Sequence, residues 1–226
     1  MSEDVIESHP LRLLKGDDGL PTGEVSLLLA RSGVGKSAAL INFALEEILQ
    51  ARHVYHFSAG MPSEKTHQYY QKILGDYARS YAPEAKHSYD EAYHHFTVIS
   101  YLDPNKMIAD MASEIDTLMA GTEIKPSLIV VDGLDFNNET SAHMKTMNEI
   151  AQKHGIKMLT SLRIHRTGDG ELDLDGPKLA AKNHASHIYW LEPADRDHIN
   201  LEFIAKDGNH LLPVYFCPHK LIFCAS

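Results

Sequence analysis

The chain has few cysteines, no long apolar run and no run of basic residues. Only two of its 226 residues are cysteine, Cys217 and Cys224, which is too few for a secreted scaffold held by disulfides. A hairpin turning at residues 218–220 would not put them opposite each other, so we expect two buried thiols. No apolar stretch approaches the roughly 20 residues that cross a bilayer, and the acidic start Met1–Asp4 is unlike a signal peptide. We therefore expect a cytoplasmic protein without a membrane span.

Basic residues are outnumbered by acidic ones, 21 to 31, and the formal net charge is −10. Because nucleic-acid binding relies on Lys and Arg that neutralise phosphates, this charge makes DNA binding doubtful unless a basic patch forms locally. Fifteen histidines are unusual, but neither His94-His95 nor the pair His184 and His187 has a third ligand at motif spacing, so a metal site there is not expected. The length suits a single domain over residues 1–226.

The most informative segment is Ala30–Ser37, which reads ARSGVGKS. The apolar run Val25–Leu29 before it predicts a buried strand, and residues 38–45 after it are typical of a helix. Glycines on such a strand-to-helix turn let the backbone wrap closely around a polyphosphate at the positive end of the helix. The alternative is an ordinary turn, and Ala30 stands where the usual pattern has glycine, which is a mild departure. The residues predicted to bind a nucleotide are Arg31, Ser32, Gly33, Val34, Gly35, Lys36, Ser37 and Ala38.

Two further side chains complete this interpretation. In a phosphate loop Lys36 reaches the β and γ phosphates, and the hydroxyl of Ser37 binds Mg²⁺. The apolar run Leu128–Val131 ends in Asp132, which a parallel sheet would put at the carboxyl edge of a central strand. There its carboxylate can hold Mg²⁺ through a water. The expected cofactors are ATP or ADP with Mg²⁺.

The remaining pattern alternates strands and helices. This alternation predicts an α/β fold, with a mostly parallel twisted sheet and helices on both faces. From His187 onward, short apolar runs separated by Pro, Gly and Asp predict an antiparallel C-terminal extension. The predicted strands are 25–29, 54–58, 96–100, 128–132 and 157–161, followed by 187–191, 198–204, 211–216 and 221–223, and the predicted helices are 37–50, 63–81, 105–119 and 141–154.

The segment Gly19–Val25, GLPTGEV, followed by the phosphate loop, resembles the start of RecA-like P-loop ATPase domains. The likeness is greatest to circadian-clock ATPases and to bacterial replicative hexameric helicases. It continues in residues 57–64, 150–156, 161–166 and 204–208, and covers roughly residues 10 to 224. The resemblance implies a homo-oligomer with nucleotide at the subunit boundary, and a further protein partner is compatible with it.

Two departures from the family pattern argue against full activity. The family carries a catalytic Glu just after the second strand, where this chain has Gly60. It also presents a Lys and an Arg, two residues apart, to the neighbour's γ phosphate; here Lys206 is kept, but Gly208 replaces the Arg. Losing the group that orients the water costs about 10²- to 10⁴-fold in rate, and losing an arginine finger about 10³- to 10⁵-fold. The pattern therefore predicts nucleotide binding with slow or absent hydrolysis.

Other carboxylates offer substitutes for the missing base, namely Glu64, Asp135 and Glu139, although we favour their interpretation as a helix-start charge and solvated loop charges. Arg163 follows the fifth strand, near the family's γ-phosphate sensor, and Ser161 competes with it for that role. Three functions remain open: a nucleotide-dependent switch or regulatory assembly, a DNA-dependent motor of the helicase or recombinase type, and an interaction module with structural nucleotide. The charge and Gly60 favour the first.

Overall fold

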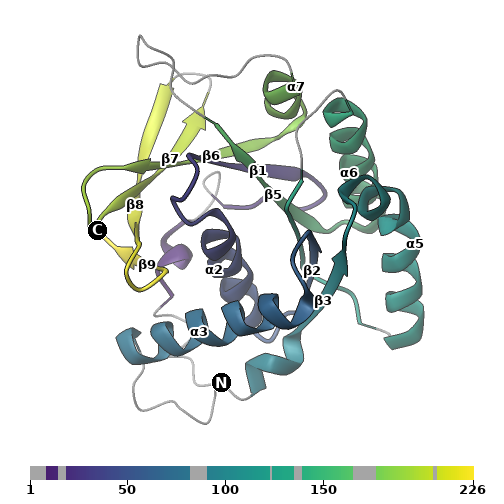
Figure 1. Cartoon of the computed structure of the whole chain (residues 1–226), viewed down its shortest axis with the longest axis horizontal. Coiled ribbons are helices and arrows are strands. Elements are labelled where there is room, and N and C mark those ends of the chain that lie inside the picture. Colours follow the sequence, from purple (N-terminus) through teal and green to yellow (C-terminus); the bar gives the residue numbers. More distant parts are fainter. Residues whose placement is uncertain are drawn as a thin grey trace.

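A single nine-stranded sheet forms the centre of the molecule (Figure 1). The computed structural model describes residues 9–14, 19–81, 91–122, 124–134, 139–164, 177–205 and 208–226. The strands are β1 (Val25–Ala30), β2 (Val54–Ala59), β3 (Phe96–Tyr101), β4 (Leu128–Asp132), β5 (Lys157–Arg163), β6 (His187–Pro193), β7 (Ile199–Ala205), β8 (Gly208–Cys217) and β9 (Ile222–Ala225). The helices are η1 (Pro10–Leu13), α2 (Lys36–Ile48), α3 (Ser63–Tyr81), η3 (Tyr93–His95), α5 (Pro104–Thr122), α6 (Thr140–His154) and α7 (Pro177–His184).

The first five strands and the four long helices confirm the predicted ranges to within a few residues at each end. Their patterns are local and strong. In α3, for example, the buried residues are spaced three or four apart, at Thr66, Tyr70, Ile73, Leu74 and Tyr77, as on one face of a helix. The short helix α7 was not predicted, because its eight residues are too few to establish a helical period.

The strand order is β3-β2-β4-β5-β1-β6-β7-β8-β9, and the antiparallel part begins one strand later than predicted. β6 pairs with β1 in parallel, with Leu28 opposite Tyr189, and only then do β7, β8 and β9 follow antiparallel. In Figure 1 these last strands extend the sheet on the left. In the final hairpin Tyr215 is opposite Cys224, so the two cysteines do not face each other, as predicted. Both are half-buried and not fully buried as expected.

The helices cover both faces of the sheet. α2 and α3 pack on one face, and α5, α6 and α7 on the other (Figure 1). The chain adds strands in one direction up to β3 and then in the opposite direction, and right-handed crossovers put the helices of these two runs on opposite faces. Side chains alternate accordingly: Leu128 and Val130 of β4 lie in the α2 and α3 core, while Ile129 and Val131 lie in the other.

Within the described ranges no helix has the length and apolar character of a membrane span.

Candidate nucleotide site

The predicted phosphate loop joins the central strand β1 to the buried helix α2. β1 has parallel neighbours on both sides, and all six of its residues are buried. The loop residues Arg31–Gly33 are exposed, whereas Val34–Ser37 are half-buried at the start of α2. The loop therefore leaves the carboxyl edge of the sheet with its tip open and its base packed.

Glycine is required at the base of the loop. Gly35 is the N-cap of α2 and has a left-handed φ of 100°. A Cβ at this position would come within 2.8 Å of Cε1 of Phe216 on β8, so the close approach of that ring also excludes a side chain. Because glycine offers no side-chain oxygen to the first turn of α2, the N–H groups there are left for another acceptor, such as a phosphate. Gly33 also has a positive φ, of 79°, but open space around it.

Asp132 ends β4 at the same edge of the sheet. It continues the alternation of Leu128 and Val130, so its side chain belongs to the face that α2 covers. The residue is only 9% exposed, and its Oδ1 accepts hydrogen bonds from the backbone N–H of Gly133 at 2.9 Å and from the hydroxyl of Ser161 at 3.5 Å. Among the described residues Oδ2 has no hydrogen-bond donor, so this carboxylate keeps an oxygen for a cation or water.

Lys36, Asp132 and Arg163 form one electrostatic group. Burial lowers the pKa of Lys36; the charge of Asp132 opposes this shift, and that of Arg163 adds to it. Arg163 is exposed at the end of β5, opposite Ala30 of β1, whereas Ser161 is buried and hydrogen-bonded to Asp132. The fold thus brings both sensor candidates to the predicted site, one beside Lys36 and one on the carboxylate. A bound phosphate would compensate the desolvated cations.

Hydroxyl and carboxylate oxygens are the ligands that Mg²⁺ prefers, and the residues here fit it. Ser37 lies in the first turn of α2, and Asp132 on the adjoining edge. Both stand at the carboxyl edge, where nucleotide phosphates would meet the loop. These two residues would hold the ion together with the phosphates.

Gly60 follows β2 with a φ of 74°, and its N–H donates to the carbonyl of Tyr101 at 2.8 Å. A Cβ built there meets no atom within 4 Å, so the position faces open space. Of the substitute carboxylates, Glu64 is exposed in the first turn of α3, and Glu139 forms an ion pair with His143 at 3.7 Å. Asp135 and Lys206 lie outside the described residues.

Sequence reasoning missed two features of this edge. The first is Gly133, whose φ is 82° and whose Cβ would come within 2.2 Å of the carbonyl oxygen of Ala59. Only glycine lets the chain after β4 pass so close to the end of β2. The signal was available in the sequence as a glycine directly after the strand-ending Asp132.

The second is a buried polar pair behind Asp132. The Nδ1 atom of His56 on β2 lies 3.0 Å from the hydroxyl of Tyr70 on α3. Burial lowers the pKa of His56 to about 4, although the charge of Asp132 opposes the shift. Burial also raises the pKa of Tyr70, and the same carboxylate adds to that shift. Both side chains are therefore neutral near pH 7. No local motif announces this pair, because it joins two elements through tertiary packing.

The sequence matches no protein-family model and no curated protein. Among solved structures, the chain is similar to the ATPase domain of a replicative helicase, with a TM-score of 0.69 and 14% sequence identity. The match covers 97% of this chain and 90% of that one. At this identity the likeness concerns the fold, and it agrees with the strand order and the loop described above. The chain has the fold of RecA-like P-loop ATPase domains.

Proposed function

We propose that this protein binds ATP or ADP with Mg²⁺ at residues 31–38 and hydrolyses ATP slowly or not at all, as a nucleotide-dependent switch or regulatory assembly. The observation that carries the proposal is the contrast within one edge of the sheet. The groups that bind phosphate and Mg²⁺ are together there, namely Lys36, Ser37 and Asp132. The position of the catalytic carboxylate is Gly60, which has open space around it.

Binding and hydrolysis rest on different groups, and this separation supports a switch. Ground-state contacts to the phosphates come from the loop N–H groups and from Lys36. The carboxylate that orients water acts in the transition state, so its absence lowers the rate and leaves the affinity. Arg163 and Lys206 are the tentative groups for the γ phosphate, the second of them acting on a neighbouring subunit's nucleotide.

The role of Lys206 depends on assembly, so the proposal includes a ring or filament of a single-domain chain over residues 1–226. The likeness to the helicase ATPase domain supports this only through the shared fold. A DNA-dependent motor is the second candidate; Glu64, exposed near the open side of Gly60, is the described carboxylate that favours it.

The test is the variant Lys36→Ala in calorimetric titration with ADP and Mg²⁺. We expect severe weakening, about tenfold or more, because a charged contact to phosphate is lost in a partly desolvated site. ATP turnover and oligomeric state near physiological ionic strength, with and without nucleotide, complete the measurement. Unchanged affinity would refute the nucleotide site, and a strictly monomeric protein at saturating ATP would refute the assembly.

A further inference from the structure

A second cavity lies at the edge of the sheet opposite the phosphate loop. Its volume is about 700 Å³, and its lining comes from segments that precede parallel strands: Thr22 before β1, His53 before β2, His95 before β3, Ser127 before β4 and Lys157 at the start of β5. β1 has six residues, each advancing about 3.3 Å, so roughly 20 Å of strand separates the cavity from the loop. The cavity is therefore distinct from the nucleotide site.

Cationic groups predominate in its lining. Arg52, Lys125 and Lys157 face the cavity, together with His53, His94 and His95, against the single carboxylate of Glu47. The chain as a whole carries a net charge of −10. A concentration of positive charge in so acidic a protein favours an anionic ligand at this position.

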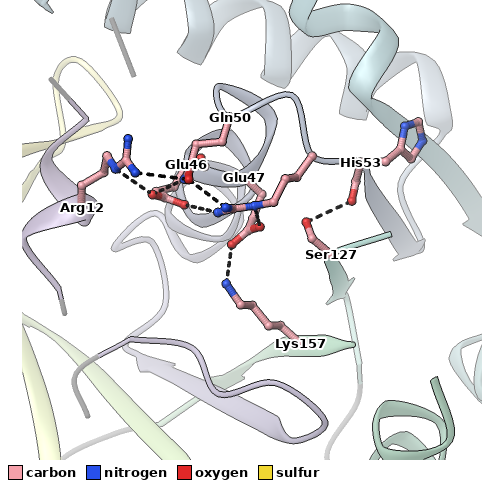
Figure 2. Close-up of polar contacts among 8 residues, drawn as sticks. Arg12, Glu46, Glu47, Gln50, His53, Ser127 and Lys157 are labelled. Atoms are coloured by element: carbon pink, nitrogen blue, oxygen red, sulfur yellow. Dashed lines mark hydrogen bonds and ion pairs between the residues drawn. The ribbon is translucent and has the colours of Figure 1, made fainter. Parts of the chain in front are cut away.

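The carboxylate of Glu47 is already neutralised. Its Oε1 accepts a hydrogen bond from Nζ of Lys157 at 2.7 Å (Figure 2), and its Oε2 accepts one from Nε of Arg52. Burial alone would raise the pKa of Glu47, but the hydrogen bonds from Lys157 and Arg52 outweigh it and hold that pKa below its ordinary value. Glu46, behind it, pairs with Arg12 at 3.6 Å and with Arg52 at 3.3 Å.

This network holds two of the cavity's cations in place. Arg52 and Lys157 are tied to a residue only 3% exposed, so they lose little further freedom when a ligand binds. The floor is also fixed, because Ser127 donates its backbone N–H to the carbonyl of His53 at 2.8 Å. The cavity is thus largely formed before binding.

Lys125 is the cation with charge to spare. Its Nζ lies 3.8 Å from the place that a Cβ on Gly155 would occupy, and it makes no ion pair with a carboxylate of the described residues. Ala51, Ile124 and Pro126 contribute apolar wall beside it. Apolar walls with a few converging charges, at a volume between about 300 and 1,000 Å³, are typical of small-molecule sites.

We propose that this cavity binds a small phosphate-bearing molecule, at a site separate from the nucleotide loop. Phosphate is the favoured chemistry because a guanidinium and two ammonium groups converge there, and these groups make strong charge-assisted hydrogen bonds with phosphate oxygens. The size of the cavity favours a metabolite over a macromolecular segment. The proposal does not depend on nucleotide binding at residues 31–38.

The experiment is calorimetric titration of Lys36→Ala with inorganic pyrophosphate, so that the loop contributes little. We expect saturable binding, and at least about tenfold weaker binding when Lys125→Glu is added, because an ammonium is replaced by a repelling carboxylate. The matched control is Lys145→Glu, which changes the net charge equally at a side chain 73% exposed on α6. It should leave the affinity within about twofold.

Thermal unfolding of Lys125→Glu should match that of the parent, since the replaced side chain makes no ion pair with the described residues. The proposal is overturned if Lys36→Ala shows no saturable binding, or if Lys125→Glu leaves the affinity unchanged. In the first case the cations only balance the carboxylates and the C-terminal ends of α2 and α6 at this edge; in the second the probe binds elsewhere. Citrate binding as tightly as pyrophosphate would overturn the assignment to phosphate.

Discussion

Gly60 is the residue on which the proposed slow hydrolysis depends. Its φ of 74° is left-handed, so a side chain there costs about 1–2 kcal/mol, but the surrounding space is open. We expect Gly60→Glu to fold and to raise ATP turnover at least about tenfold, a partial share of the roughly 10²- to 10⁴-fold that a positioned base contributes. Affinity for ADP should hardly change.

The matched control for this prediction is Gly60→Gln, which has the same length and the same backbone cost but no carboxylate. Its turnover should stay at the parent level in a steady-state phosphate-release assay. Brisk hydrolysis by the unaltered protein, abolished by Glu64→Gln or Asp135→Asn, would show instead that a substitute base exists.

Gly133 has the opposite surroundings, and its substitution should affect folding. An added Cβ would lie 2.2 Å from the carbonyl oxygen of Ala59, at a φ of 82°. We expect Gly133→Ala to lower the free energy of unfolding by more than about 2 kcal/mol in urea titration. Gly121→Ala, in α5 with nothing near its Cβ, should instead be neutral or stabilising by about 0.5–1 kcal/mol. Equal effects of the two variants would contradict the described close approach.

At the scale of elements, the docking of the η1 segment depends on a buried histidine. His9, which precedes η1, is 2% exposed; its ring lies 5.1 Å from that of Tyr77 on α3, and neither ring nitrogen has a hydrogen-bond partner among the described residues. Burial, with a smaller contribution from Arg12, lowers the pKa of His9 to about 3. His56 on β2 is likewise buried in the neutral form.

These two histidines should make the protein sensitive to acid. Their pKa values are depressed in the folded state, so the unfolded chain binds protons first as the pH falls below about 6.5. The stability present above pH 6.5 is then lost, by about 2 kcal/mol per histidine at pH 5. Denaturant titrations at pH 7 and pH 5 measure this loss, and His9→Phe should remove about half of it. An identical pH dependence in the variant would show that His9 is not buried as described.

At the scale of the whole molecule, the net charge of −10 governs encounters with nucleic acid. We expect weak, sequence-independent DNA binding, because few phosphates can be neutralised. Fluorescence anisotropy with a labelled oligonucleotide at about 50 and 200 mM salt measures it. Tight binding with a steep salt dependence would revive the motor function.

Much of the fold could be predicted from the sequence alone. The runs at Val25 and Leu128 are continuous and apolar because the strands are buried on both faces, and α3 repeats its buried residues at helical spacing. The loop Arg31–Gly35 was equally legible, since its backbone conformation depends on its own glycines. Such patterns are local, so they survive without knowledge of neighbours.

Only the tertiary structure decided which strands pair and what lies beside each site. β6 has the same alternation whether it runs parallel or antiparallel, and the choice for β1 as its partner depends on the crossover through α7. The contact of Phe216 with Gly35 joins residues far apart in the chain, as does the approach of Ala59 to Gly133. The cavity around Lys125 draws on segments before five strands. Single-residue patterns record which side of an element is buried, but not what it is buried against, because that partner is chosen by packing across the whole sheet.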